Sequence, residues 1–281
     1  MSDRIAVIGA GQMGNGIVHV SVVAGHDVTM IDISQAALDK ARATIDKNLD
    51  RQVKKGALDE AAKAAAMARI VTATSLDAVA NATFVIEAAT ENVGLKHQLF
   101  ADLDRLAPAG AILATNTSSI SITEIAGRVK RPEAVIGMHF MNPVPVMQLV
   151  EVIRGLATSD ATTARTVALA TGLGKTPVEV NDYPGFVANR ILMPMINEAV
   201  YCVMEGVGTP EAIDQVMKLG MNHPMGPLAL ADFIGLDTCL AILEVMHTGL
   251  GDPKYRPCPL LRKYVAQGWV GKKAGRGFYK Y

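Results

Sequence analysis

Short apolar runs alternate with longer amphipathic stretches through the first half of the chain. The runs contain few polar residues, which predicts strands that are buried on both faces. They span residues 5–8, 28–31, 70–73, 84–88, 112–115 and 134–139. Because helix-like stretches separate these runs, the pattern predicts strands joined by crossover helices in a parallel sheet.

Two of the intervening stretches have a recognisable helical form. Residues 34–69 are charged and alanine-rich and are interrupted at Gly56, which predicts two helices that project from the sheet. Ser121 and Glu124 form a capping box that begins a helix after the run at residues 112–115. Residues 116–120 are therefore expected to form a loop that leads from a strand to a helix.

The chain changes character near Asp182. Before it, the βα pattern continues through strand-like residues 149–153, helix-like residues 161–172 and strand-like residues 176–180. From Pro184 onward, turns rich in Gly, Pro and His separate four predicted helices. These helices span residues 186–205, 210–219, 227–246 and 259–267. We expect two domains, residues 1–182 and 183–281, and the nearly all-round apolar helix 186–205 to be buried or packed against another subunit.

Composition narrows the class of protein. The chain has 281 residues, 50% of them hydrophobic, which suggests about two domains with sizeable cores. Lys plus Arg and Asp plus Glu both total 27, so neither nucleic acid nor anionic lipid is an expected partner. The uncharged residues 5–25 contain Gln12, Asn15 and His19, which argues against a membrane span, and no signal-peptide pattern precedes them.

The three cysteines give no indication of a metal site. Their number is odd and they have no CxxC spacing, so we expect buried apolar side chains or incidental thiols in a reducing cytoplasm. They are Cys202, Cys239 and Cys258.

A glycine-rich turn between the first apolar run and the first helix is the strongest binding motif. Gly9 suits a tight turn, Gly11 lets a pyrophosphate approach the backbone, and Gly14 permits close packing of helix on strand. Glycines also mark ordinary turns, so this turn alone is weak evidence for a dinucleotide site. Together with Gln12 and Met13, these glycines are our candidates for contacts to the dinucleotide.

Asp32 makes the dinucleotide interpretation specific. It follows the second apolar run, where its carboxylate can accept both hydroxyls of an adenosine ribose, although it could instead cap the next helix near Ser34. A carboxylate repels a 2′-phosphate, and neither Ile33 nor Ser34 is a cation that could bind one. NAD is therefore expected rather than NADP.

His139 and Glu151 are the candidates for acid–base chemistry. Each lies in a strand-like run, where an ionised carboxylate is costly without a partner, and the proline-rich residues 142–145 could bring the two strands side by side. A glutamate on one ring nitrogen would fix the tautomer and leave the other nitrogen for a substrate hydroxyl. Taken singly, a satisfied core histidine and an edge-strand glutamate would be the simpler interpretations.

Other polar residues follow the strands, where ligands bind in doubly wound sheets. Glu91 and the loop from Asn116 to Ser118 are expected near the nicotinamide end. Ser118 could bind a substrate oxygen or be a turn hydroxyl. Lys96 could pair with cofactor oxygens or with Glu91, although a solvated helix lysine is the commoner case. Asn189 lies just past the domain boundary, where it could reach the site or instead serve in helix capping or internal hydrogen bonding.

These motifs, in this order, resemble those of the 3-hydroxyacyl-CoA dehydrogenase family over nearly the whole chain. The matching segments are residues 9–14 (GAGQMG), 87–92 (EAATEN), 116–119 (NTSS), 137–145 (GMHFMNPVP), 184–190 (PGFVANR) and 271–279 (GKKAGRGFY). The resemblance implies a Rossmann-type α/β domain with a doubly wound sheet that binds NAD. It also implies an all-α C-terminal domain that mediates homodimer formation and closes over an acyl-CoA, in fatty-acid or butanoate metabolism.

The resemblance also implies a role for individual residues. His139 is the acid/base and Glu151 its orienting partner, while Ser118 and Asn189 hold substrate oxygens. The residues implied to contact NAD, beside the glycine-rich turn, are Asp32, Glu91, Lys96, Asn116 and Lys273. Lys55, with help from Lys54, would meet a CoA phosphate, and Asn48 replaces a serine that contacts CoA in some members.

Two other functions remain open from the sequence. One is a dehydrogenase of similar architecture that acts on 3-hydroxy acids without CoA. The other is a catalytically silent, crystallin-like protein that binds NAD, against which the presence of His139, Glu151, Ser118 and Asn189 argues.

Overall fold

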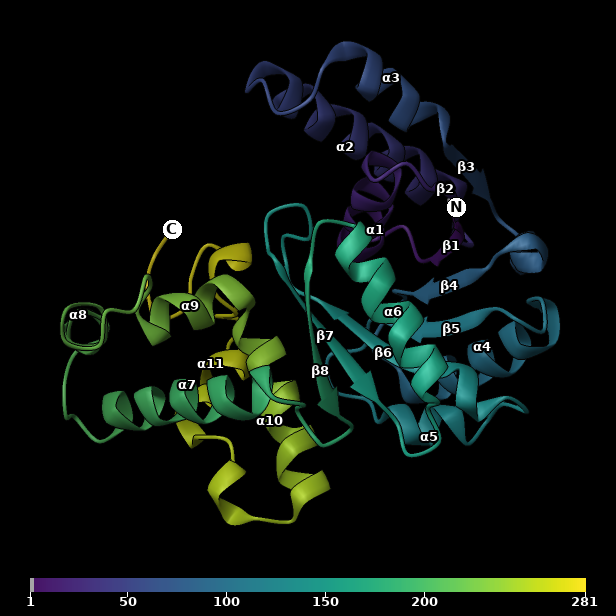
Figure 1. The fold of residues 1–281 in the computed structure, drawn as a ribbon. Helices are drawn as coiled ribbons and strands as arrows, with labels where there is room; N and C mark the ends of the chain where they lie inside the picture. Colours follow the sequence, from purple (N-terminus) through teal and green to yellow (C-terminus); the bar gives the residue numbers. More distant parts are fainter. Residues whose placement is uncertain (1–2) are drawn as a thin grey trace. The chain divides into compact units, whose positions relative to one another are not determined.

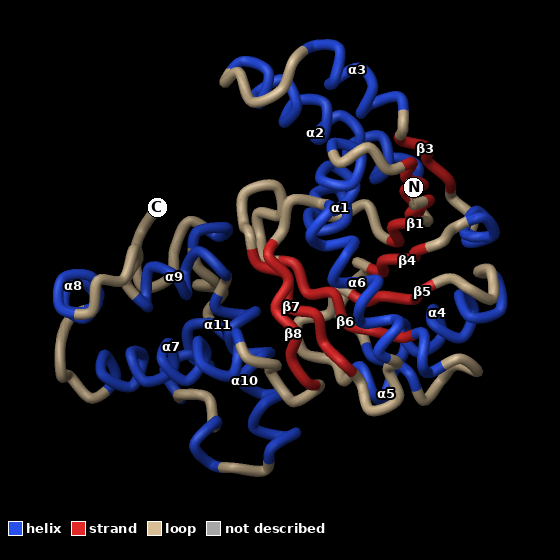
Figure 2. Tube along the Cα trace, viewed as in Figure 1, coloured by secondary structure: helices blue, strands red, loops and turns tan. Residues whose placement is uncertain are grey.

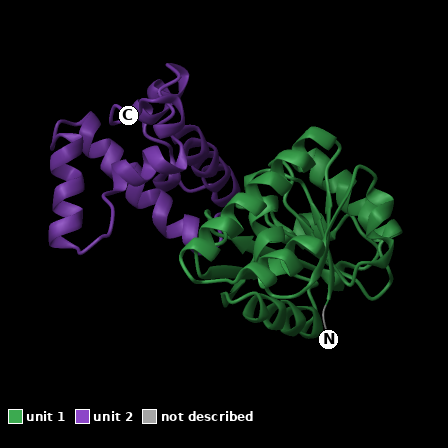
Figure 3. Ribbon diagram, turned by 90° about the horizontal axis from the view of Figure 1, so that it is seen from above, with its two compact units in different colours: residues 1–182 green, residues 183–281 purple. Residues whose placement is uncertain are grey.

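The structure, a computed structural model, describes residues 3–281 and divides into two units. The first unit ends at Asp182, and the second spans Tyr183–Tyr281. Figure 3 draws the first in green and the second in purple.

The described residues of the first unit form an 8-stranded sheet with the strand order β3-β2-β1-β4-β5-β6-β7-β8 (Figures 1 and 2). The strands are β1 (Arg4–Ile8), β2 (Asp27–Ile31), β3 (Ile70–Ala73), β4 (Phe84–Glu87), β5 (Ile112–Thr115), β6 (Val135–Phe140), β7 (Leu149–Arg154) and β8 (Thr176–Asn181). The strand order reverses between β1 and β4, which is the switch point where ligands bind in open α/β sheets.

One strand pairing departs from the expected parallel sheet. β7 pairs with β6 in antiparallel orientation, whereas the other neighbouring strands pair in parallel. The connection, residues 141–148, is shorter than the roughly 12 residues that a parallel crossover needs, so the chain must turn back. The cis peptide bond Asn142–Pro143 lies in this connection.

Helices cover both faces of the sheet, as Figure 3 shows for the first unit. α1 (Gln12–Val23), α2 (Gln35–Lys54) and α6 (Asp160–Gly172) share one apolar cluster with alternate residues of the strands. α4 (Val93–Leu106) contacts β5, and α5 (Ile122–Ala126) contacts β6. The central strands β4, β5 and β6 are buried along their whole length, which is why their apolar runs were visible in the sequence. The short helices of this unit are η1 (Leu76–Asn81) and η2 (Pro132–Ala134).

The predicted helical pair at residues 34–69 is confirmed as α2 and α3 (Glu60–Ala68), which stand beyond β2 and β3 in Figure 1. Ser34 caps α2 by accepting a hydrogen bond from the N–H of Ala37, and Asp59 caps α3 in the same way. Gly56 has φ +70°, a left-handed conformation that glycine adopts without strain, and it ends the first helix as expected.

The second unit is helical, as predicted, but two of its boundaries differ from our expectation. Its elements are α7 (Ala188–Met204), α8 (Pro210–Gly220), α9 (Pro227–Ile234), α10 (Leu236–Leu250), η3 (Pro253–Tyr255), α11 (Pro259–Ala266) and η4 (Lys272–Ala274). The single helix predicted over residues 227–246 is wrong, because Gly235 has φ +106° and separates α9 from α10. The helix predicted from residue 186 begins at Ala188, after positive φ values at Gly185 and Phe186.

α7 buries one face and leaves apolar side chains on another. Met193 and Ile196 are buried in the cluster of the second unit, while Ile191 is 69% exposed. Val216 and Leu219 of α8 are also exposed. The second unit therefore carries apolar surface beyond what its own core uses.

We predict that Gly14→Ala destabilises the first unit by about 3 kcal/mol or more, because overpacking against backbone is costly. A Cβ at Gly14 would lie 1.8 Å from the carbonyl oxygen of Gly9, so the turn or α1 must shift. Urea denaturation measures the effect. Gly172→Ala is the matched control, because nothing lies within 4 Å of a Cβ there. Equal stability of the two variants would contradict the packing constraint.

Candidate functional site

The glycine-rich turn joins β1 to α1 at the switch point of the sheet. Gly9 has φ +101°, and a Cβ there would lie 2.6 Å from the carbonyl oxygen of Ala88, so only glycine fits. Nothing lies within 4 Å of a Cβ at Gly11. Gly11 is the N-cap of α1 and no side chain caps the helix, so its first N–H groups can receive an anion.

Asp32 lies at the carboxyl end of β2 and supports this turn. Its Oδ2 accepts a hydrogen bond from the N–H of Ala10 at 2.8 Å, and its Oδ1 accepts one from the N–H of Ser34 at 2.9 Å. The cap of α2 is the hydroxyl of Ser34 and not Asp32, so the capping alternative for Asp32 is wrong.

A pocket of about 980 Å³ opens beside this turn and lies wholly within the first unit. Of the expected cofactor and substrate residues it is lined by Gly9, Gly11, Gln12, Met13, Asp32 and Asn48. Gly14 packs beneath the turn instead. Lys54 and Lys55 lie exposed at the end of α2 and are not part of the lining.

Sequence reasoning missed several residues of the pocket. Lys40 is the one cation among its described lining residues, and Thr44 and Asn142 also line it. Lys40, Thr44 and Asn48 follow one another at intervals of four residues, which places them on one face of α2. That spacing could have revealed them.

The loop after β6 closes one side of the pocket and contacts α1. Nε2 of Gln12 donates a hydrogen bond to Oδ1 of Asn142 at 3.0 Å. A Cβ at Gly16 would lie 2.8 Å from Cβ of Val144, so α1 and the loop meet without space between them. Nζ of the buried Lys175 donates to the carbonyl oxygens of Val144 and Met147 at 2.5 and 2.9 Å, which fixes the loop from beneath. Burial lowers the pKa of this ammonium.

His139 and Glu151 face each other across β6 and β7, as the sequence suggested. They are direct partners in the antiparallel register, and Nδ1 of His139 lies 2.8 Å from Oε2 of Glu151. The side chain of His139 is 10% exposed and that of Glu151 3% exposed. A buried carboxylate on one ring nitrogen fixes the tautomer and leaves the other ring nitrogen to exchange a proton.

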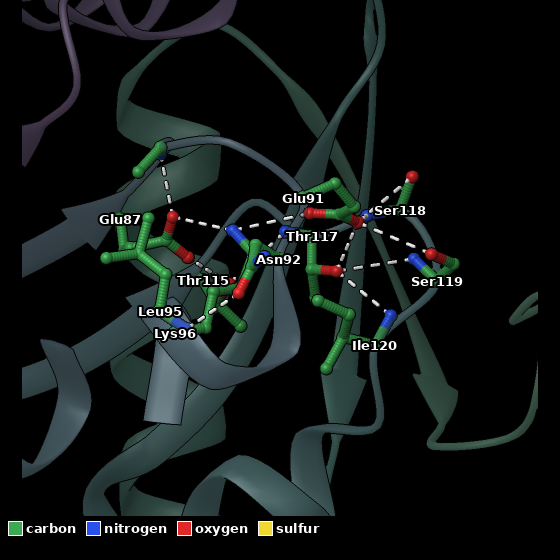
Figure 4. Close-up of polar contacts among 11 residues, drawn as sticks. Glu87, Glu91, Asn92, Leu95, Lys96, Thr115, Thr117, Ser118, Ser119 and Ile120 are labelled. Carbon is green, nitrogen blue, oxygen red and sulfur yellow. Dashed lines mark hydrogen bonds and ion pairs between the residues drawn. The ribbon is translucent and has the colours of Figure 1, made fainter. Parts of the chain in front are cut away.

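The loops after β4 and β5 form a second polar cluster, drawn in Figure 4. Oε1 of Glu91 accepts hydrogen bonds from the hydroxyl of Thr117 at 2.5 Å and from the N–H of Ser118 at 2.8 Å. The Ser118 hydroxyl donates to the same oxygen at 3.2 Å. Oδ1 of Asn116 accepts from the N–H of Phe140 at 2.9 Å, which ties this loop to the strand of His139.

Lys96 is not a solvated helix lysine; it pairs with Glu91, as one interpretation expected, and lies still closer to Glu87. Its Nζ lies 2.6 Å from Oε1 of Glu87 and 3.3 Å from Oε2 of Glu91, and its side chain is 1% exposed. Glu87 was not among the expected site residues, because nothing in the apolar run before it indicates a partner. Burial would raise the pKa of Glu91, but Lys96 and the donors of Thr117 and Ser118 outweigh burial and hold that pKa below its ordinary value.

Two expected site residues belong to the second unit. Asn189 is buried in the first turn of α7. Nζ of Lys273 pairs with Oδ2 of Asp237 at 2.7 Å. The roles of these two residues remain predictions.

The remaining observations exclude some site types among the described residues. No group of His, Cys, Asp and Glu there could hold a metal ion. The three cysteines are free thiols. No helix in the described part of the chain is long and apolar enough to cross a membrane.

Comparison with known proteins gives one family for both parts of the chain. Residues 4–183 match the family model of the 3-hydroxyacyl-CoA dehydrogenase NAD binding domain, and residues 185–281 match that of the C-terminal domain. A Bacillus subtilis protein named probable 3-hydroxybutyryl-CoA dehydrogenase is 60% identical over 278 residues, 99% of this chain and 97% of the relative. A Bradyrhizobium diazoefficiens protein named 3-hydroxybutyryl-CoA dehydrogenase is 56% identical over 99% of this chain and 95% of the relative. The crystal structure of (S)-3-hydroxybutyryl-CoA dehydrogenase from Ralstonia eutropha is 54% identical with a TM-score of 0.97, covering 100% of this chain and 99% of that one.

We predict that Glu91→Gln lowers the free energy of unfolding by about 1.5 kcal/mol near pH 7, the usual value of a hydrogen bond to a charged group. A carboxylate whose pKa is lowered by folding stabilises the protein above its ordinary pKa of about 4.3 and loses this effect as the pH falls through the lowered value. The difference between variant and wild type should therefore shrink below about pH 4.

Urea denaturation from pH 7 to pH 3 measures this dependence. The exposed Glu60 of α3 provides the control variant Glu60→Gln. A difference for Glu91→Gln that stays constant across the range would contradict the prediction.

Proposed function

The chain belongs to the 3-hydroxyacyl-CoA dehydrogenase family, and on this premise we propose that it interconverts 3-hydroxybutyryl-CoA and acetoacetyl-CoA with NAD. The 60% and 56% identical relatives support the short acyl chain through their names. The name of the Ralstonia enzyme supports the (S) isomer of the alcohol. Fatty-acid or butanoate metabolism is the proposed context.

The single observation that carries the proposal is the buried contact of His139 with Glu151. The strand that holds His139 continues directly into residues 142–145, which line the pocket beside the glycine-rich turn. An oriented imidazole at the end of a strand, next to a dinucleotide turn, is what the oxidation of an alcohol requires.

The residues of the first unit fit NAD. Gly9 and Gly11 leave the turn without side chains, and the uncapped start of α1 suits a pyrophosphate. The carboxylate of Asp32 suits an unphosphorylated ribose, because it would repel a 2′-phosphate. When bound, NAD supplies the nicotinamide that takes the hydride from C3 of the substrate, or returns it in the reverse reaction.

His139 moves the proton in this mechanism. In the oxidative direction, its Nε2 accepts the proton of the 3-hydroxyl, while Glu151 on Nδ1 stabilises the imidazolium that forms. In the reductive direction, the imidazolium returns the proton to the 3-oxygen. Burial of the pair keeps water from competing for this proton.

The other expected residues bind and orient the substrate. Ser118 and Asn189 hold substrate oxygens, and Asn48 faces the pocket from α2, beyond which Lys54 and Lys55 meet a CoA phosphate. The positive charge of Lys40 in the lining supports binding of a ligand that carries phosphates.

Among the cofactor contacts, Glu91 and Asn116 belong to the loops at the carboxyl ends of β4 and β5. Lys273 contributes from the second unit. Lys96 supports Glu91 from within its buried pair with Glu87.

The proposed assembly is a homodimer in the cytoplasm. The exposed apolar side chains of Ile191, Val216 and Leu219 on α7 and α8 support association through the C-terminal helices. The free thiols of the three cysteines fit a reducing compartment.

We predict that His139→Gln lowers kcat for acetoacetyl-CoA reduction by about 10² to 10⁴, the usual contribution of general acid–base catalysis. Binding of NADH, measured by fluorescence titration, should be unchanged. His26→Gln is the matched control, because His26 lies in the turn after α1 and accepts a hydrogen bond from the N–H of Asp3. Normal turnover by His139→Gln would show that the assignment is wrong.

The substrate and the cofactor are tested together in one steady-state experiment. Acetoacetyl-CoA, longer 3-ketoacyl-CoAs and free acetoacetate are each reduced with NADH and with NADPH. We expect the highest kcat/KM for acetoacetyl-CoA with NADH, because the CoA moiety supplies binding energy and Asp32 opposes a 2′-phosphate. An equal kcat/KM for free acetoacetate would favour a CoA-independent dehydrogenase, and no turnover at all would favour a silent NAD-binding protein.

A further inference from the structure

A buried pair of opposite charges connects β4 to α4, away from the surface of the pocket. Lys96 is 1% exposed and Glu87 is fully buried, so neither group exchanges its partner with water. Burying such a pair is rarely worthwhile for stability alone, because apolar residues of similar volume often stabilise a protein as well. The pair therefore needs another explanation.

The contacts of Glu87 fix where the ammonium group lies. Oε1 of Glu87 accepts from the N–H of Ala89 at 2.7 Å as well as from Nζ of Lys96. Oε2 accepts from the hydroxyl of Thr115 at 2.6 Å. Both carboxylate oxygens are thus held by residues at the ends of β4 and β5, and Lys96 is held by them in turn.

The ammonium group has a second carboxylate on its other side. Figure 4 shows Lys96 between Glu87 and Glu91, and Glu91 between Lys96 and the loop that carries Ser118. The N–H and the hydroxyl of Ser118 both donate to Oε1 of Glu91. Lys96 is the charged group that faces Glu91 among the described residues, and the donors of Thr117, Ser118 and Ser119 also contact the carboxylate.

We propose that Lys96, held by Glu87, is a positioning residue for Ser118 and acts on it through Glu91. This inference rests on the proposed function, in which Ser118 holds a substrate oxygen. The ammonium keeps the carboxylate of Glu91 ionised, and an ionised carboxylate accepts the hydrogen bonds of the loop more strongly than a protonated one. Without this charge, the hydrogen bonds between the loop and Glu91 weaken. Ser118 then positions the substrate oxygen less accurately.

The test removes the charged pair without leaving an unpaired charge. Lys96→Met alone leaves the carboxylate of Glu87 buried without its cation and should lower Tm by roughly 10 °C. The double variant Glu87→Gln, Lys96→Met removes both charges and should keep Tm within about 5 °C of wild type. Activity is therefore read in the double variant, after wild-type turnover of acetoacetyl-CoA has been measured.

We expect kcat of the double variant to fall by about 10- to 100-fold, the effect of misplacing a group that orients the substrate. The acid limb of its kcat–pH profile should move to higher pH, because Glu91 then protonates more easily. KM for NADH should stay within about three-fold of wild type, since little binding energy to the cofactor is removed.

Two results would overturn the inference. An unchanged kcat and pH profile would make the pair merely structural, and a raised KM for NADH with unchanged kcat would make Lys96 a direct cofactor contact. Absence of wild-type turnover would instead count against the proposed function and not against the link from Lys96 to Glu91.

A second variant keeps the inference testable if the double variant does not fold. Thr117→Val removes the donor closest to Glu91 without changing any charge, so the acid limb should again move to higher pH. Thr171→Val, on the exposed side of α6, is its matched control. A pH profile of Thr117→Val that matches the control would contradict the role of Glu91.

Discussion

The antiparallel register of β6 and β7 is the constraint on which the proposed chemistry depends. Side chains alternate between the two faces of a strand, so a slip of one residue would move Glu151 to the opposite face of the sheet from His139. The carboxylate would then be buried without a donor, at a cost of several kcal/mol. The short connection at residues 141–148 and the contacts of Lys175 beneath it hold this register.

Much of this arrangement could be predicted from the sequence because its signals are local. A few neighbouring residues are enough to identify the glycine-rich turn, the capping box at Ser121 and the apolar strands. The structure confirms these elements. The contact of His139 with Glu151 was predictable for another reason: two ionisable residues in neighbouring apolar strands need a partner.

The features that escaped prediction depend on the folded conformation rather than on a local sequence signal. Lys96 pairs with Glu87, and the apolar run before Glu87 gives no hint of the lysine on the next helix. Lys40 lines the pocket only because α2 lies beside the glycine-rich turn. The break at Gly235 was missed because an isolated glycine does not by itself end a helix, whereas its positive φ in the folded chain does.

The contact of α1 with the loop after β6 has a consequence for altering this protein. Gln12 and Gly16 belong to the segment that would be exchanged to change the cofactor preference, yet they meet Asn142 and Val144. A transplanted nucleotide segment that enlarges position 16 would displace the loop leading away from His139. A redesign therefore has to replace both segments together. Substitutions at positions 12 and 16 should be tolerated only when positions 142 and 144 change to match them.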